Sequence, residues 1–175
     1  LKWWSRRPSN AFTPENAWCY EKYQSGEYSP AAKPVFDALS STPAAYNKEN
    51  PLIGTWKVLC ETNKLKGIKK TASELTGQQA NFHYAVLSAT RFTHTHGHSV
   101  PINIADKEKF YINRNLYADV KWIDENLIAV TIVTETGKVK EYSQYEIWER
   151  VTDNVSPLTR IATSFPKNTQ RIMTK

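Results

Sequence analysis

The middle of the chain alternates apolar and polar residues with a period of two. Between residues 110 and 122 every second position is apolar except Arg114, and the positions between them are polar or Tyr. A period of two places alternate side chains on opposite faces, so this stretch predicts a long, half-buried β-strand. A run rich in Val, Ile and Thr over residues 127–134 predicts a second strand. Residues 135–138 predict a hairpin turn, and residues 139–151 predict the returning strand.

Two further strands are predicted upstream, over residues 52–61 and 80–96, while residues 63–77 predict a loop or a short helix. The short connections favour antiparallel pairing. Long antiparallel strands without covering helices must close on themselves, or pair face to face, to protect their edges. We therefore expect a mainly β fold, with a small antiparallel meander closed into a bent barrel of about six to eight strands.

Proline divides the chain into three parts. Six prolines lie in the first 51 residues and two in the tail, whereas only Pro101 interrupts residues 52–156. Proline removes a backbone donor and cannot occupy a central strand. This distribution predicts an N-terminal arm over residues 1–50, a barrel over 51–152 and a basic tail over 153–175. The arm is rich in Pro and aromatic residues, and we expect short helices in it that begin after Thr13 and near Ala31.

Composition and charge exclude several classes of protein. The 175 residues are 40% hydrophobic, and no apolar run approaches the ~20 residues of a membrane helix, so we expect a soluble protein. The net charge is +6, but the only dense basic cluster is Lys64, Lys66, Lys69 and Lys70. Nucleic-acid binding is therefore not expected. A chain that starts at Leu1 suggests a processed N-terminus, as in secreted or organellar proteins, and leaves the compartment open.

Gly54 and Trp56 open the first predicted strand, and Arg150 lies on the last one. This Gly-x-Trp arrangement resembles the signature of the calycin barrels, the lipocalins and intracellular fatty-acid-binding proteins, over about residues 51–151. The resemblance implies that Trp56 closes one end of the barrel and that Arg150 packs across its ring. An Arg over an indole face is worth roughly 0.5–2 kcal/mol. The resemblance also implies an interior that holds a small hydrophobic molecule.

Arg114 is the only charge on the apolar face of residues 110–122. An inward Arg in a small barrel is costly unless it is paired, and a ligand carboxylate is one such partner. The alternatives are an internal Asp or Glu, a bulge that turns Arg114 outward, or a position at the open end. In the ligand hypothesis Arg114 meets the polar head group of a hydrophobic or amphipathic molecule. The side chains expected to line the cavity are Phe82, Tyr84, Phe92 and Tyr142.

Three of the four histidines, His94, His96 and His98, alternate along the chain. On a regular strand their imidazoles share one face, an arrangement that can bind zinc or copper. The alternative is a polar strand end whose histidines are solvated, and Gly97 favours it because glycine often ends or bulges a strand. The metal-site hypothesis therefore depends on a regular strand.

An enzyme is the less favoured interpretation, because the sequence contains no phosphate-binding loop, no Ser elbow and no evident nucleophile–base pair. Cys19 and Cys60 lack basic neighbours that would lower a thiol pKa. The main alternative to ligand binding is a structural accessory subunit whose arms, residues 1–50 and 153–175, contact protein partners. The anchors expected for such contacts are Trp3, Trp4, Trp18 and Phe165.

Overall fold

The structure is a computed structural model that describes residues 33–78, 83–94 and 98–159. Several predicted features lie outside these residues: the helix after Thr13, the four aromatic anchors, Cys19, Phe82 and His96. The elements are α2 (Lys33–Ser40), β1 (Gly54–Thr62), α3 (Ile68–Gln78), β2 (His83–Leu87), β3 (Arg91–His94), β4 (His98–Pro101), β5 (Asn103–Asp106), β6 (Lys109–Asn113), β7 (Leu116–Asp124), β8 (Leu127–Thr136), β9 (Val139–Tyr142) and β10 (Tyr145–Arg150).

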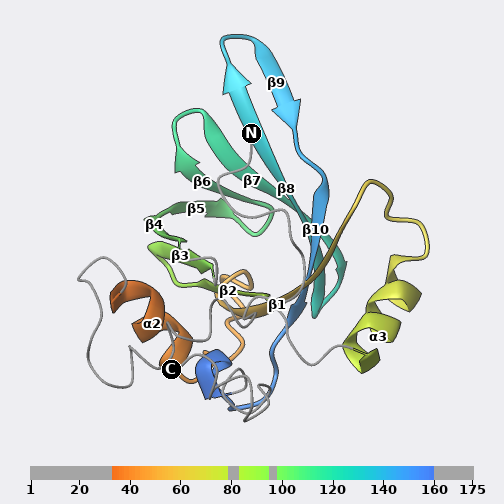
Figure 1. The fold of residues 1–175 in the computed structure, drawn as a ribbon. Coiled ribbons are helices and arrows are strands. Elements are labelled where there is room, and N and C mark those ends of the chain that lie inside the picture. Colours follow the sequence, from red (N-terminus) through yellow and green to blue (C-terminus); the bar gives the residue numbers. More distant parts are fainter. Residues whose placement is uncertain (1–32, 79–82, 95–97, 160–175) are drawn as a thin grey trace, which may run out of the picture.

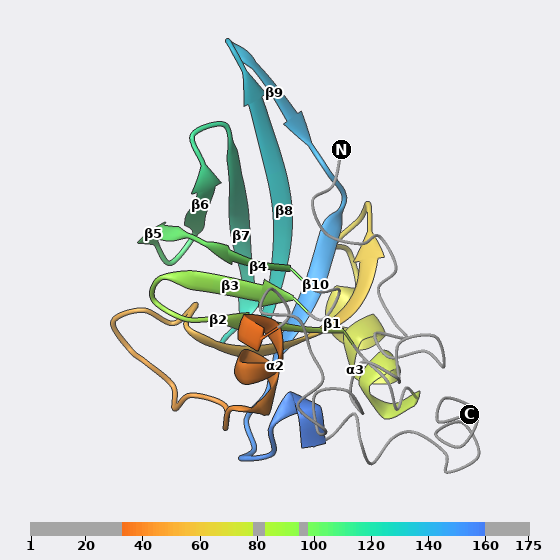
Figure 2. The same cartoon turned by 60° about the vertical axis from the view of Figure 1, so that its left-hand side comes forward.

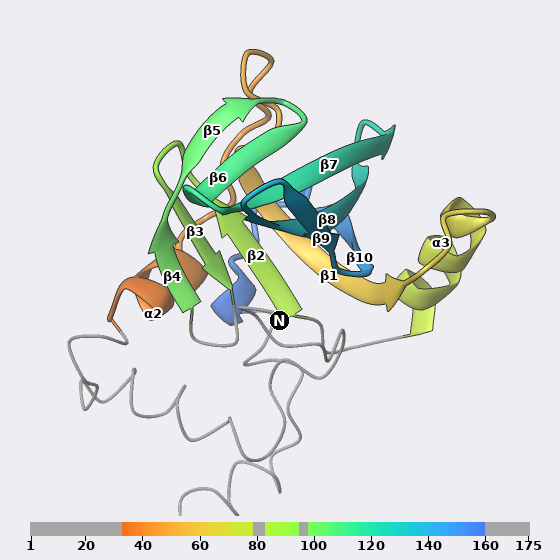
Figure 3. The same ribbon diagram turned by 90° about the horizontal axis from the view of Figure 1, so that it is seen from above.

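All ten strands belong to one antiparallel sheet. Its order is β4-β3-β2-β1-β10-β8-β7-β6-β5, and β9 pairs with β8 off this path. The sheet bends into a nearly closed barrel, so that the strands run around a common centre when seen from above (Figures 1 and 3). The β8–β9 hairpin projects beyond the other strands (Figure 2). The predicted fold class, a mainly β antiparallel meander bent into a barrel, is thus confirmed.

The barrel has more strands than predicted, because the predicted strands over 80–96 and 110–122 are hairpins and the one over 139–151 is divided into β9 and β10. Strands β4 and β5 were not predicted. Residues 110–122 form β6, a turn and β7, and the pairs Phe110↔Ala118 and Tyr111↔Tyr117 join even with even and odd with odd numbers. The alternation therefore continues through the turn as if the strand were unbroken. In the β2–β3 hairpin the odd-numbered Leu87 pairs with the even-numbered Phe92. Odd-numbered residues of β2 and even-numbered residues of β3 therefore lie on the same face of the sheet. These two registers decide which predicted residues face the interior.

The buried residues form two clusters, one on each side of the sheet. The inner cluster contains Leu52, Trp56, Val58, Ala85, Leu87, Phe92, Phe110, Ala118, Val120, Ile128, Val130, Ile132 and Trp148. The outer cluster contains Leu39, Leu59, Ile68, Ala72, Tyr84, Leu127, Ala129, Ile147, Val151 and Leu158. Helix α3, in the stretch predicted as a loop or short helix, packs on β1, and α2 packs on β2, β3 and β4. Residues from both sides of the 51–152 segment therefore help to cover the barrel.

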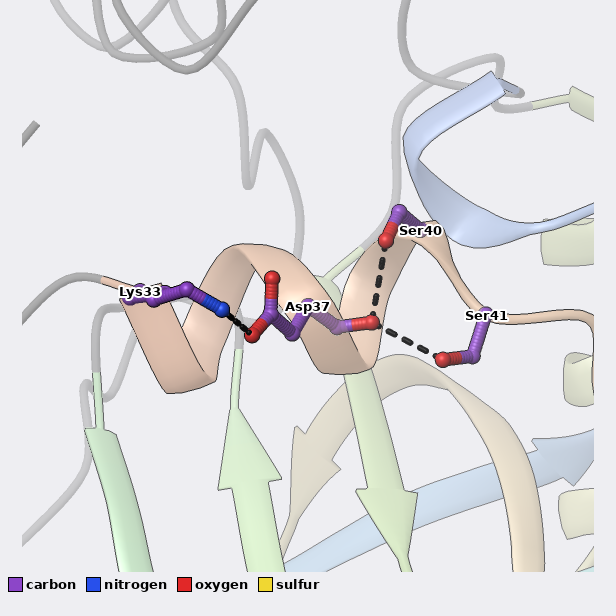
Figure 4. A network of polar contacts seen from close by, with 4 residues as sticks. All are labelled: Lys33, Asp37, Ser40 and Ser41. Atoms are coloured by element: carbon purple, nitrogen blue, oxygen red, sulfur yellow. Dashed lines mark hydrogen bonds and ion pairs between the residues drawn. The ribbon is translucent and has the colours of Figure 1, made fainter. Parts of the chain in front are cut away.

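Helix α2 lies where the sequence predicts a second short helix, and polar side chains stabilise it at both ends. Lys33 Nζ lies 2.6 Å from Asp37 Oδ2, one turn further along. The hydroxyls of Ser40 and Ser41 both donate to the backbone oxygen of Asp37, at 3.0 and 2.8 Å (Figure 4). Helix ends leave carbonyls without intrahelical partners, and these two hydroxyls satisfy one of them. Among the helices described, none has the length and hydrophobicity to cross a bilayer.

Candidate functional site

Tyr46, Arg150 and Trp56 form a three-layer stack at one end of the barrel. Trp56 is fully buried on β1 and is the register partner of Arg150 on β10. The guanidinium carbon of Arg150 lies 4.3 Å from the centre of the Trp56 ring and 4.9 Å from that of Tyr46. The indole Nε1 of Trp56 donates to the backbone oxygen of Leu52 at 3.0 Å. This hydrogen bond holds the segment before β1 against this end of the barrel.

Arg150 also connects three segments through hydrogen bonds. Its Nη2 donates to the backbone oxygens of Pro51 at 2.8 Å and Glu125 at 3.3 Å, and its Nε donates to Asn126 Oδ1 at 3.2 Å. Burial lowers the pKa of Arg150, while Tyr46 and Glu125 act in the opposite direction. A guanidinium can satisfy several acceptors at once because its donors form a rigid planar fork.

Gly54 completes this end of the barrel. Its φ of +154° is one that side-chain-bearing residues rarely adopt, and a Cβ atom at this position would meet Arg150 Nη1 at 3.2 Å. A glycine therefore leaves space for the guanidinium to approach the strand. The structure brings Gly54, Trp56 and Arg150 together in the arrangement that the calycin resemblance implies.

The interior next to this stack is filled by aromatic rings. Phe92 stacks on Trp148 with 5.8 Å between centroids and lies 5.9 Å from Phe110. Trp148 in turn lies 6.4 Å from Trp56. Trp122 meets the edge of Trp56 at 6.1 Å. Phe92, Phe110, Trp148 and Trp56 are fully buried, so side chains of the protein itself occupy this part of the barrel.

The residues predicted to line one cavity lie in different parts of the structure. Phe92 faces the interior, but Tyr84 belongs to the outer cluster because the β2–β3 hairpin changes the parity of the buried face. Tyr142 is 61% exposed on β9, in the hairpin that projects from the barrel. Neither tyrosine lines the interior, and the expectation that all of these residues surround one cavity needs correction. Phe82 lies outside the described residues.

The histidines are only partly placed by the structure. His94 is fully buried, and its ring lies 5.6 Å from that of His83 and 6.0 Å from Phe92. The backbone of His98 is paired with that of His94 across β3 and β4. Within residues 33–78, 83–94 and 98–159, no group of three or more His, Cys, Asp or Glu is arranged to hold a metal ion. A zinc or copper site that uses His94, His96 and His98 stays a prediction.

Two buried ionisable residues were missed by sequence reasoning. His83 and Glu146 are 1% and 2% exposed, and Glu146 Oε1 accepts a hydrogen bond from Trp148 Nε1 at 2.9 Å. The position of Glu146 in the sequence indicates its burial, because Glu146, Trp148 and Arg150 occupy every second position of β10 and so lie on the same face. A carboxyl group on the buried face of a strand requires a hydrogen-bond donor, because burying a polar group without a partner is costly.

Cys60 has no features of a reactive nucleophile. It is a half-buried free thiol among the described residues. Burial raises its pKa, and the negative charges of Glu146 and Glu61 raise it further. Reactive cysteines need surroundings that favour the thiolate, whereas the surroundings of Cys60 favour the protonated thiol.

Arg114 lies at the other end of β7 from the turn that Arg150 contacts. It occupies the β6–β7 turn, whereas Glu125 and Asn126 form the β7–β8 turn, and the nine residues of β7 separate the two ends by roughly 30 Å. Arg114 is exposed and lines a groove of about 520 Å³. The other lining residues are Pro101, Ile102, Asn103, Tyr111, Ile112 and Asn113.

The groove combines an apolar wall with one cation. Ile102 and Ile112 are half-buried and pack against the inner cluster. Among the described residues Arg114 forms no hydrogen bond or ion pair, so its guanidinium is available to a ligand. Sequence reasoning identified Arg114 but not the groove. Its other wall comes from the β4–β5 junction, which no motif marks.

No family model, curated protein or solved structure matches this chain. The class of protein is therefore defined by the fold alone. It is a nearly closed antiparallel β-barrel, compatible with a calycin-like fold.

Proposed function

We propose that the protein is a β-barrel that binds a small amphipathic molecule in the Arg114 groove. The apolar part of the ligand lies against Ile102 and Ile112, and an anionic head group meets Arg114. The observation that carries this proposal is a groove of about 520 Å³ whose wall includes the Arg114 guanidinium, which has no partner among the described residues. Ligand sites typically have about 300–1,000 Å³ and a few polar groups on apolar walls.

This proposal moves the ligand from the barrel centre to one end. Arg114 and Phe92 were expected to share a single cavity, but Phe92 is part of the packed ring cluster and Arg114 is on a turn. A planar guanidinium forms paired hydrogen bonds with carboxylates and related anions. Arg114 at the rim can make these bonds without paying the desolvation cost of a fully buried charge.

We expect Arg114→Ala to weaken binding of the anionic aromatic probe 1-anilinonaphthalene-8-sulfonate about 10- to 100-fold, because hydrogen bonds to a charged group are worth about 1.5–3 kcal/mol. Fluorescence titration measures the affinity. The matched control is Lys138→Ala, which removes an exposed cation from the β8–β9 turn and should leave the affinity unchanged. Equal affinities for the wild type and Arg114→Ala would rule out this function.

A second candidate function is that of an accessory subunit in a protein assembly. The observation that favours it is the projecting β8–β9 hairpin, where Val139 and Tyr142 are 60% and 61% exposed (Figures 1 and 2). Exposed apolar side chains on a projecting element are typical of protein contacts. If the arms also serve a partner, limited proteolysis of the isolated protein should remove residues 1–50 and the tail quickly and leave a core near 51–152. A full-length chain that resists the protease would argue against this role.

A further inference from the structure

We infer that the ligand of the Arg114 groove is a small carboxylate with a compact apolar body, and that a long acyl chain gains nothing there. This inference rests on the proposed function and narrows it to one chemical class. It follows from the hydrogen-bonding groups at the rim of the groove and from the packing behind its floor.

The rim of the groove offers hydrogen-bond donors. Asn113 Oδ1 accepts a hydrogen bond from the backbone nitrogen of Asn115 at 2.9 Å, so the group that Asn113 has left for a ligand is its NH₂. Arg114 adds the five donors of its guanidinium. Among the residues that the structure describes, the lining includes no carboxylate that would compete for these donors. An ionised carboxylate only accepts hydrogen bonds, and its planar shape matches the guanidinium fork.

The floor of the groove is closed. Ile102 and Ile112 pack against the inner cluster, in which Phe110 is fully buried. From Phe110 the rings continue through Phe92 to Trp148 and on to Trp56, with centroid separations of 5.9, 5.8 and 6.4 Å. Protein interiors are packed as densely as organic crystals, so an acyl chain cannot pass along this path unless rings move. The far end of the path is closed in turn by Arg150 on Trp56.

The ligand must therefore lie within the groove itself. Residues 111–114 extend over roughly 10 Å at about 3.3 Å per residue, a length that suits a medium-chain acid or a fused aromatic acid. Methylenes that fit inside are removed from water, and each can raise the affinity by up to about fourfold. Methylenes beyond that length stay in water and add nothing.

The test is a calorimetric titration of the full-length wild-type protein with unbranched carboxylates, each below its micellar concentration. We expect affinity to rise by up to about fourfold per methylene from butanoate to octanoate, and then to stay within about twofold through decanoate and hexadecanoate. We expect 2-naphthoate to bind at least as tightly as octanoate, because its rigid body loses less conformational freedom. A gain that continues through hexadecanoate would overturn the inference while leaving the proposed function in place.

Two comparisons separate the parts of the inference. Octan-1-ol has the same chain without the charge, and we expect it to bind about 10-fold more weakly than octanoate or worse. Equal binding of the two would overturn the choice of a carboxylate. If the probe, the acids and the alcohol all fail to bind, the proposed function itself is wrong.

The ring wall can also be tested directly with Phe110→Ala. Removing this ring opens space behind Ile112, so hexadecanoate should then bind more tightly than octanoate. An unchanged length profile in a folded Phe110→Ala variant would show that the wall does not limit the ligand. If this variant does not fold, the wild-type length series still decides the inference.

Discussion

Arg150→Ala is expected to destabilise the folded protein by about 3–4 kcal/mol. The substitution removes the guanidinium from between Trp56 and Tyr46, where cation–π contacts are worth roughly 0.5–2 kcal/mol. It also removes the donors to Pro51, Glu125 and Asn126 at the closed end. Hydrogen bonds to charged groups contribute about 1.5–3 kcal/mol, and acceptors left buried without donors add to the loss.

The free energy of unfolding, measured by urea denaturation, checks this value. The control is Arg91→Ala, because Arg91 is exposed and its side chain donates hydrogen bonds to the hydroxyl and the backbone oxygen of Ser99. We expect the control to lose about 1 kcal/mol or less. Arg150→Lys should recover only a small part of the loss, because an ammonium lacks the planar fork. A loss no larger for Arg150→Ala than for Arg91→Ala would show that the stack does not stabilise the barrel end.

The fold class followed from the alternation of apolar and polar residues, but the number of strands did not. In the β6–β7 hairpin the residues paired before the register shift at Tyr111 have the same parity, so the alternation over 110–122 resembles that of a single strand. A turn at residues 114–115 contains no glycine or proline to mark it. The β2–β3 hairpin changes parity instead, and continuous counting through it assigned Tyr84 to the wrong face. Register is decided by the turn and the long-range packing, which a local pattern does not contain.

The two ends of the barrel differ in how far the sequence could predict them. The sequence predicted the first end from the local Gly54-x-Trp56 motif and from Arg150 on the last strand. The structure places Arg150 against both residues of the motif. The stack also includes Tyr46, which no sequence pattern indicated because it lies in a loop before β1. The groove at the other end depends on Pro101, Ile102 and the β6–β7 turn coming together. The pairing of β5 with β6, in which Asn103 lies opposite Tyr111, makes them neighbours.

The ring cluster connects these two ends and gives them different roles. Arg150 stacks on Trp56 at one end, and Phe110 packs on Phe92 towards the groove at the other. Each buried aromatic side chain of the cluster contributes to stability through its burial. Under the proposed function, the same side chains also limit the size of the ligand.

Trp148 is the residue of this cluster whose loss is expected to cost most, about 4–5 kcal/mol for Trp148→Ala. Truncation leaves a large cavity beside Phe92 and Trp56, and Trp→Ala substitutions in cores cost about 3–5 kcal/mol. It also removes the indole donor from Glu146, a carboxylate that is 2% exposed. Weakening the hydrogen bonding of a buried charge adds a further penalty.

Trp148→Phe separates these two effects. Phe keeps a ring on Phe92 but cannot donate to Glu146, so we expect a loss of about 2 kcal/mol. The matched control is Trp122→Phe, because the Trp122 indole donates to the backbone oxygen of Lys107 at 2.7 Å in a more exposed setting and should lose about 1 kcal/mol or less. Urea denaturation, fitted with one shared m-value, gives the free energies of unfolding of the wild type, Trp148→Ala, Trp148→Phe and Trp122→Phe. A Trp148→Phe protein as stable as the wild type would show that the indole donor is not needed to hold the Glu146 carboxylate inside the barrel, and the loss in Trp148→Ala would then be packing alone.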